Sequence, residues 1–238
     1  MLRPVWLGCV PYARALRLQE AVLAARHQPE ATHDVLLLLE HPPTITIGRR
    51  RGAADNILDP TEVEVVQVSR GGDVTWHDRG QLVAYPIIAL EDARQDLRDH
   101  LSRIETGVMA TLTRLGLAPH RDPRNTGVWL PCADQQSRKV CSIGVACRQW
   151  VTWHGLALNV DNELEQFSRI NPCGFDADVM TRLEDHASGW SVADLVPGLA
   201  EDLAAALARE LAPIDEIVFE RDEQIDELAD RLVRGIAL

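Results

Sequence analysis

Apolar residues recur at helical spacing in several long stretches of the chain. Residues 11–28 (PYARALRLQEAVLAARHQ) place alanines and leucines mostly on one side behind a proline, a pattern typical of an amphipathic helix. Residues 96–117 predict a longer helix that ends at a glycine signal. Two acidic stretches, 191–213 and 220–238, carry alanine and leucine on their inner faces. The region from about residue 190 to 238 is therefore predicted to be helical and acidic.

Shorter apolar runs between these helices predict strands. DVLLLLEH (34–41) and TITIGRR (44–50) are separated by two prolines, and EVEVVQVS (62–69), VTWH (74–77) and QLVAYPIIAL (81–90) follow. From residue 139, KVCSIGVACRQWVTWHGLALNV predicts two strands that turn around RQW. At 238 residues and 46% hydrophobic content, the chain can bury a full core, so we expect one α/β domain over residues 1–238.

The overall charge restricts the possible partners. The formal net charge is −12, whereas sequence-independent binding of nucleic acid needs a strongly basic surface, so no nucleic-acid partner is predicted. An acidic partner would have to dock on a local basic patch. The best candidate is the GRRRG stretch with Arg49, Arg50 and Arg51, although a solvated loop explains these residues equally well.

Cysteine usage and hydropathy indicate the compartment. The five cysteines form an odd set without a CxxC pair, so the sequence suggests neither a disulfide framework nor a zinc ribbon. The first residues lack a charged segment followed by a long apolar run, and no stretch approaches the length of a membrane span. We therefore predict a cytoplasmic protein with reduced thiols and no membrane contact.

Lys139 is the only lysine in the chain, against 23 arginines. Arginine stays protonated in proteins, whereas a lysine amine in apolar surroundings can lose its proton and act as a base. In an extended strand, Lys139 would share an apolar face with alternate residues from Cys141 to Cys147, and His154 would share the side of Leu156. This pattern predicts an amine and an imidazole that both point into a dry region, and the alternative is a surface lysine retained by chance.

Two further segments carry candidate chemistry. In SRGGDVTWHDRGQLVAYP (69–86), Gly71 and Gly72 permit a close backbone approach to an acyl or phosphate group, although an ordinary tight turn is the simpler interpretation. The segment has neither the context of a dinucleotide site nor the ending of a P-loop. In RINPCGF (169–175), Cys173 lies between proline and glycine, where a thiol can be an exposed nucleophile or simply a small buried hydrophobe.

Five segments together resemble a known family. LLEHPPTITIGRR, RGGDVTWHDRGQLVAYP, RKVCSIGV, WHGLALNV and FSRINPCGF occur in the order and approximate spacing of the octanoyltransferases of lipoate biosynthesis, over about residues 10–183. The resemblance implies a mixed β-sheet flanked by helices, like the catalytic domain of biotin and lipoate ligases. It also implies transfer of an octanoyl group from acyl carrier protein to the ε-amine of a lysine, through an acyl-thioester on cysteine and without a cofactor. The implied acceptors are lipoyl domains of 2-oxoacid dehydrogenases and the glycine cleavage H protein.

Matched residue by residue, the family's nucleophile falls on Cys173 and its paired lysine on Lys139. As a cation, this lysine would stabilise a thiolate, and as a neutral amine it would accept the proton of the incoming ammonium; arginine could do only the first. His154 is a further candidate lining residue, and no metal site is predicted because no third ligand stands at a recognisable spacing. The implied substrate-binding residues are Arg70, Gly71, Gly72, Asp73, Val74, Thr75, Trp76, His77, Ser142, Ile143, Gly144, Gly155, Leu156 and Ala157.

The chain departs from the family at one turn. Where the family usually reads HGPGQ, this chain reads HDRGQ, with Asp78 and Arg79 in place of a glycine and a proline. The change brings the segment closer to the pattern of ATP-dependent lipoate–protein ligases. A ligase would give Cys173 no role, however, and its lysine-rich nucleotide contacts cannot form in a chain with one lysine. A carrier-protein binding module that has lost catalysis is a third interpretation.

Overall fold

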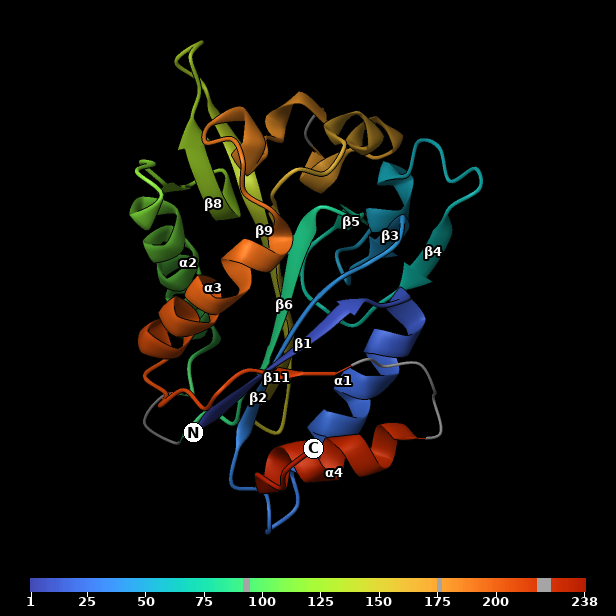
Figure 1. Cartoon of the computed structure of the whole chain (residues 1–238). Coiled ribbons are helices and arrows are strands. Elements are labelled where there is room, and N and C mark those ends of the chain that lie inside the picture. Colours follow the sequence, from blue (N-terminus) through green and yellow to red (C-terminus); the bar gives the residue numbers. More distant parts are fainter. Residues whose placement is uncertain (92–94, 175–176, 218–223) are drawn as a thin grey trace.

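A large mixed sheet with helices on both faces forms the body of the molecule (Figure 1). The computed structural model describes residues 1–91, 95–174, 177–217 and 224–238, and of Cys173 it describes only the backbone. The eight strands of the large sheet run in the order β11 (Asp215–Glu216), β1 (Leu2–Cys9), β2 (Asp34–Glu40), β6 (Gln81–Ile87), β10 (Val151–Asn159), β9 (Ser137–Arg148), β8 (Asn125–Pro131) and β7 (His120–Asp122). β1 is parallel to β11 and β2, and the remaining pairs are antiparallel.

A smaller sheet lies beside one end of the large one (Figure 1). It contains β4 (Glu64–Gln67), β3 (Thr44–Ile47) and β5 (Val74–His77), with β3 parallel to β4 and antiparallel to β5. The structure also contains the short 3₁₀ turns η1 (Ala53–Asn56), η3 (Leu164–Arg169), η4 (Pro172–Gly174), η5 (Ala177–Val179) and η6 (Leu183–Asp185), of which η1 and η4 contact β5. β4 is shorter than the strand predicted over residues 62–69, because only the middle of that segment pairs with β3.

Two helix pairs cover the two faces of the large sheet. α1 (Tyr12–Arg26) packs with α4 (Ile225–Arg234) on one face, and α2 (Leu97–Arg114) packs with α3 (Val192–Ala206) on the other. The leucine run of β2 explains how one strand serves both cores. Leu36 and Leu38 belong to the α2–α3 side, whereas Val35, Leu37 and Leu39 belong to the α1–α4 side. This architecture confirms the predicted mixed sheet flanked by helices.

Helix boundaries follow from local capping chemistry. The Asp96 side chain accepts the backbone N–H groups of Arg98 and Asp99 and so starts α2. Ser191 and Asp194 form a reciprocal capping box at the start of α3. α4 ends at Gly235, whose φ of 68° lies in the left-handed region. The last predicted helix is thus shorter than its sequence pattern, and residues 220–223 of that pattern lie outside the described part of the chain.

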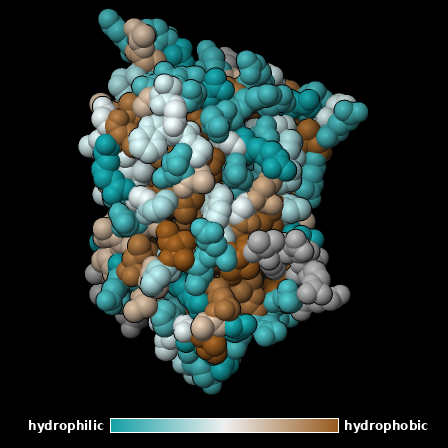
Figure 2. Space-filling view, in the orientation of Figure 1, coloured by the Kyte–Doolittle hydropathy of each residue, from teal (hydrophilic) through white to brown (hydrophobic). Residues whose placement is uncertain are grey.

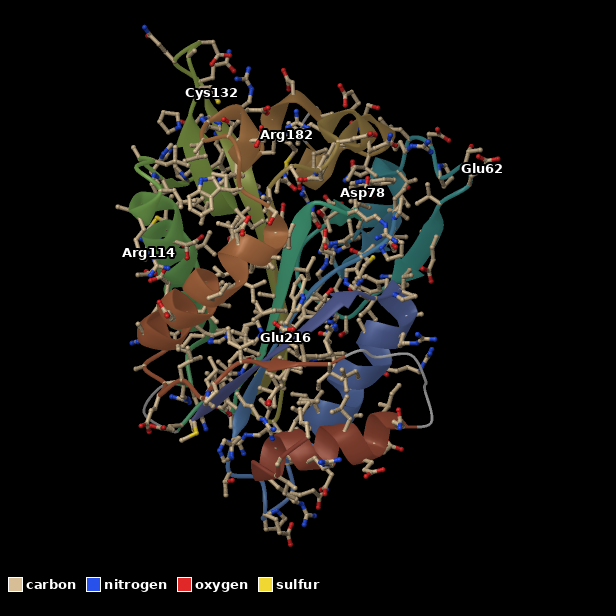
Figure 3. All side chains as sticks on the ribbon, in the orientation of Figure 1. Glu62, Asp78, Arg114, Cys132, Arg182 and Glu216 are labelled. Carbon is tan, nitrogen blue, oxygen red and sulfur yellow. The ribbon has the colours of Figure 1, made fainter. Side chains whose placement is uncertain are left out.

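The surface is mixed in character. Hydrophilic residues cover much of the face drawn in Figure 2, with hydrophobic ones visible mainly across its middle. Charged side chains such as Glu62, Arg114 and Glu216 extend from widely separated elements in Figure 3. Within the described ranges, each helix is too short or too polar to cross a membrane.

The alternation expected along β9 is interrupted at Lys139. Between Val128 and Trp129 of β8, the partner on β9 changes from Cys141 to Lys139, so β9 carries one extra residue at Val140. Val140 and Cys141 both lie in the α2–α3 core, and Lys139 instead lines a cavity beside that core. The prediction that Lys139 and Cys141 share one face is therefore wrong, because a bulge reverses the direction of the lysine side chain.

The expected side of His154 is also wrong. His154 has a φ of 56°, and its ring contacts Trp153 and Tyr85, which pack on the α1–α4 side of the sheet. Leu156 packs on the opposite, α2–α3 side. The left-handed backbone at His154 breaks the two-residue alternation on which the prediction depended.

Candidate active site

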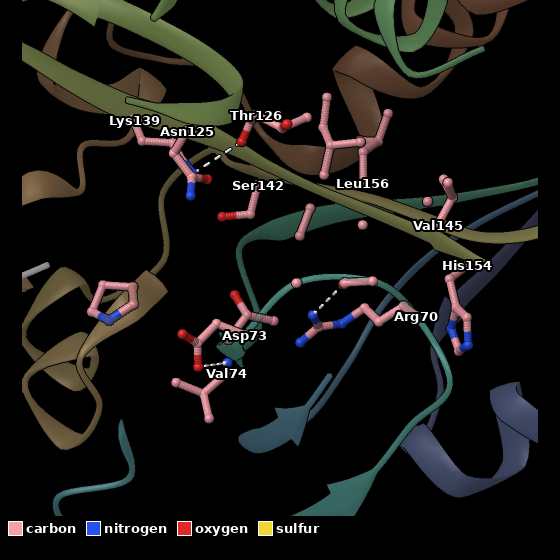
Figure 4. Close-up of a pocket in the computed structure, with 18 of the residues that line it drawn as sticks. Arg70, Asp73, Val74, Asn125, Thr126, Lys139, Ser142, Val145, His154 and Leu156 are labelled. Carbon is pink, nitrogen blue, oxygen red and sulfur yellow. Dashed lines mark hydrogen bonds between the residues drawn. The ribbon is translucent and has the colours of Figure 1, made fainter. Parts of the chain in front are cut away.

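A cavity of about 230 Å³ lies between the small sheet and strands β9 and β10 (Figure 4). Most of its lining comes from four parts of the chain. These are the segment from Arg70 into β5, the start of β8, the facing parts of β9 and β10, and the turns around residues 172–180. Segments far apart in sequence therefore meet at one site.

Glycines let the loop at residues 70–72 lie directly on the large sheet. The Gly71 N–H donates to the carbonyl of Val145 at 2.9 Å, and a Cβ at Gly144 would lie 2.9 Å from the Gly71 oxygen. A Cβ at Gly48 would lie 2.4 Å from the oxygen of Gly72, whose own φ is +90°. These glycines therefore allow a close approach of the loop to a neighbouring strand, and the predicted approach to an acyl or phosphate group stays a prediction.

Arg70 fixes this loop to the small sheet. Its guanidinium donates to the Thr46 carbonyl at 3.2 Å, to the Thr46 hydroxyl at 2.9 Å and to the Gly71 carbonyl at 3.1 Å. The side chain lines the cavity and is almost fully buried. Its positive charge therefore acts on the cavity from a position set by three hydrogen bonds.

Lys139 is buried at one end of the cavity, with 3% of its surface exposed. Its Nζ donates to the Asn125 side-chain oxygen and, at 3.0 Å, to the Thr126 carbonyl, as Figure 4 shows. The same nitrogen lies 5.1 Å from the centre of the Trp129 ring. Two oxygen acceptors and an aromatic face all favour a protonated amine. The chance surface lysine is thus excluded.

Cys173 lies on η4, and its side chain is outside the described residues. The backbone around it is nevertheless tied to the cavity. Pro172 lines the cavity directly, and Met180 forms a bridge with Lys139. The Thr181 N–H also donates to the Lys139 carbonyl at 2.9 Å. Residues 180 and 181, which follow η4 in the chain, are therefore attached to the strand that carries the predicted lysine.

Buried tyrosine and histidine rings form the other end of the cavity. His41 Nδ1 donates to the Val10 carbonyl at 2.7 Å, so its Nε2 accepts the Tyr85 hydroxyl at 2.8 Å. Tyr12 packs against His41 at 4.8 Å between ring centres. Burial lowers the pKa of His41 to about 4 and raises the pKa of Tyr12 to about 12. All these rings are neutral near pH 7.

His77 and His154 are also held as neutral imidazoles. Burial, followed by the neighbouring His41, lowers the pKa of His77 well below its usual value. The Gln81 amide nitrogen donates to the Trp76 carbonyl, so its oxygen faces His77 and accepts from Nδ1 at 2.8 Å. Burial, with the Arg70 charge, lowers the pKa of His154 to about 3. Neither ring therefore carries a charge in the cavity near neutral pH.

The structure brings together nearly all the substrate-binding residues implied by the sequence. Trp76 is the exception among them, because it packs with Ile45 and Phe167 in a cluster around the small sheet. Its ring points toward that cluster, whereas Thr75 and His77 on either side of it in β5 line the cavity. His154 and Lys139 line the cavity as expected, and the other implied residues do so as well: Arg70, Gly71, Gly72, Asp73, Val74, Thr75, His77, Ser142, Ile143, Gly144, Gly155, Leu156 and Ala157.

Several lining residues have no signal in the sequence. Asn125 and Thr126 begin β8, a strand that the periodicity did not predict, so the partners of the lysine amine were missed. Their only sequence clue is a lone NTG stretch before an apolar run. The remaining missed lining residues are Tyr12, Tyr85, Leu101, Val145, Pro172, Val179 and Met180.

The unusual turn at Asp78 and Arg79 lies outside the cavity lining. It joins β5 to β6, and Asp78 accepts the Arg79 N–H at 2.8 Å (Figure 3). Gly80 has a φ of +79°, and a Cβ there would lie 2.5 Å from the Asp161 carboxylate. The turn thus keeps the glycine that its left-handed backbone requires. Asp78 and Arg79, which differ from the family pattern, do not line the cavity. Among the residues that the structure describes, no three His, Cys, Asp or Glu side chains group closely enough to hold a metal ion.

This combination of sheet, glycine loop and buried amine defines a class of catalytic domain. Residues 11–204 match the family model of the lipoyl protein ligase A/B catalytic domain. The structure superposes on a lipoate protein ligase from Thermoplasma acidophilum with a TM-score of 0.75, at 19% identity over 100% of this chain and 98% of that one. Biotin protein ligase from Aquifex aeolicus gives 0.51 at 12% identity, over 87% and 70% of the two chains. These structures establish the fold.

Sequence comparison distinguishes between the families that share this catalytic domain. An octanoyltransferase from Geobacter sp. strain M21 is 48% identical over 168 residues, which are 71% of this chain and 78% of the relative. The octanoyltransferase of Corynebacterium jeikeium is 43% identical over 213 residues, 86% and 87% of the two chains. The chain belongs to the octanoyltransferase family, a family of acyltransferases.

Proposed function

We propose that this protein transfers an octanoyl group from octanoyl-acyl carrier protein to the ε-amine of a lysine on a lipoyl domain, through a thioester on Cys173. The observation that carries the proposal is the burial of the only lysine amine in a cavity that Pro172, the neighbour of Cys173, also lines. The Thermoplasma acidophilum ligase belongs to an archaeal lipoylation system together with its E2 lipoyl domain, which supports this class of acceptor.

In the first half-reaction, the Cys173 thiolate attacks the thioester carbonyl of the donor. The new carbon–sulfur bond forms as the bond to the carrier sulfur breaks. The departing carrier thiolate takes a proton from the Lys139 ammonium, which leaves that amine neutral. The contacts of Lys139 with Asn125 and Thr126 support this sequence, because they stabilise the protonated form that the resting thiolate needs.

In the second half-reaction, neutral Lys139 accepts a proton from the ammonium of the incoming lysine. The resulting amine attacks the acyl-enzyme, the amide forms, and the Cys173 thiolate is released. One proton leaves to solvent, so Lys139 is again an ammonium and the enzyme has returned to its starting state. An arginine at this position could not complete the second step, because its guanidinium keeps its proton.

Intact-mass measurement tests the covalent route. The protein is mixed with octanoyl-acyl carrier protein without an acceptor, and the Cys173→Ser variant is treated in parallel. We expect an octanoyl mass increment on the wild type, located on the peptide of Cys173, and none on the variant. Cys132→Ser is the matched control and should still be acylated. Acceptor modification without any acyl-enzyme would refute the covalent route, and lipoate-dependent pyrophosphate exchange would favour an ATP-dependent ligase instead.

A further inference from the structure

Asp73 lines the cavity, yet its carboxylate is directed at the protein. The two oxygens accept the Asn56 side-chain amide at 2.9 and 2.8 Å, and one of them accepts the Val74 N–H at 2.8 Å. The other accepts the Arg50 guanidinium at 3.0 Å. The Asp73 side chain is 1% exposed, whereas that of Arg50 is 57% exposed. A carboxylate used in this way has little capacity left for a ligand.

Asn56 connects Asp73 to the chain next to the turn that contains Cys173. Its carbonyl accepts the Asn171 N–H at 2.8 Å, while its side chain holds Asp73. Ile57 then bridges Ile170, and the N–H groups of residues 58 and 59 both donate to the carbonyl of residue 169. Residues 56–59 and 169–171 therefore form a short backbone ladder next to η4.

This ladder ends two residues before Cys173 in the chain. Because Pro172 has no N–H, the bond from Asn171 to Asn56 is made by the last backbone donor before the nucleophile. On the far side of the turn, the Thr181 N–H is bonded to the Lys139 carbonyl at 2.9 Å. Asn56 thus holds the chain immediately before η4, and the strand of the lysine holds it at residue 181.

We infer that Asp73 and Asn56 are positioning residues that hold the η4 turn, and with it Cys173, at the correct place beside Lys139. The inference rests on the proposed function for the role of Cys173, but the contacts of Asp73 and Asn56 do not depend on that function. It assigns Asp73 a different task from contact with the acyl chain. Small displacements of a reacting group, about 1 Å, can reduce a rate by roughly 10²-fold.

Alkylation of Cys173 as a function of pH tests positioning without any acyl substrate. The reaction with iodoacetamide is followed on the peptide that contains Cys173, in the wild type, Asn56→Ala and the isosteric Asp73→Asn. If these residues hold the thiol beside the Lys139 ammonium, the midpoint of alkylation should rise by at least about half a pH unit in both variants. Gln67→Ala is the matched control. Its amide also binds backbone carbonyls on the small sheet, at Ile47 and Gly48, and its midpoint should not change.

Acylation kinetics give an independent readout. Asn56→Ala should lower the single-turnover rate of acyl-enzyme formation about 10- to 100-fold at saturating donor, with the KM for donor changed less than about threefold. The double variant Asn56→Ala/Asp73→Ala should lose little more of this rate than either single variant, because both residues act through the contact between the Asn56 amide and the Asp73 carboxylate. Additive losses with a raised KM, or unchanged alkylation midpoints in folded variants, would overturn the inference. Absence of acylation in the wild type would refute the proposed function and leave the alkylation result to decide the positioning role.

Discussion

Removing the side-chain oxygen of Asn125 should disturb the charge on Lys139. In Asn125→Ala, the Lys139 Nζ keeps the Thr126 carbonyl and the Trp129 ring but loses its other oxygen acceptor. A hydrogen bond to a charged group contributes about 1.5–3 kcal/mol, and 1.36 kcal/mol corresponds to one pH unit. Water that enters the space left by the amide would recover part of this energy. The loss acts on the protonated amine, so its pKa should fall by about one unit, and the pH midpoint of Cys173 alkylation should rise by less than that.

The assay compares two variants of Asn125 on β8 with one variant of Lys139 on β9. Asn125→Ala should react like a weaker form of Lys139→Met, in which the ammonium is absent. Asn125→Asp should have the opposite effect, because a carboxylate beside the amine stabilises the ammonium and with it the thiolate. Transfer to the acceptor lysine should then slow in Asn125→Asp, since Lys139 gives up its proton less readily. If Lys139→Met moves the midpoint and neither Asn125 variant does, the assignment of Asn125 is wrong.

Three further predictions concern the base, the packing and the pH dependence. Lys139→Arg should retain some acylation of Cys173 while transfer to the acceptor falls much further, and equal losses in the two half-reactions would contradict the base role. Gly155→Ala would place a Cβ 2.1 Å from the Ala84 carbonyl, so urea unfolding should show a loss of about 1–3 kcal/mol, and a change within 0.5 kcal/mol would count against the packing argument. The folded-state pKa values of His41 and His154, about 4 and about 3, lie below the value of about 6.5 for an unfolded chain. Stability should therefore be constant above about pH 6.5 and decline as the pH falls toward these values, by up to roughly 3 kcal/mol for His41 and roughly 5 kcal/mol for His154, and a urea midpoint unchanged at pH 5 would refute this linkage.

The elements with a clear period could be predicted from the sequence. The four helices and the leucine run of β2 have patterns that burial on one or two faces explains directly. β1 and β8 were missed for a physical reason. Each is buried on both faces for much of its length and is short or interrupted by proline or glycine, so neither alternates in a recognisable way.

The site could be predicted in composition but not in geometry. Motif order pointed to the loop of Arg70 and to the strands that carry Ser142 and Gly155, and these parts do line one cavity. The directions of Lys139 and His154 could not be derived from alternation, because a bulge and a left-handed residue interrupt it. Neither the bulge nor the left-handed residue changes the pattern of hydrophobic and polar positions along the sequence. The partner Asn125 depends on the same bulge, since the register between β8 and β9 brings it to the amine.

The extra residue in β9 has a consequence for how this protein tolerates change. With regular pairing, the sole lysine would be directed among the leucines and valines that α2 and α3 cover. Deletion of Val140, by contrast, would remove the extra residue and leave Lys139 opposite Trp129, so the amine would keep its direction while the α2–α3 core would lose one valine side chain. A deletion at this position should therefore lower stability more than it changes the direction of the amine.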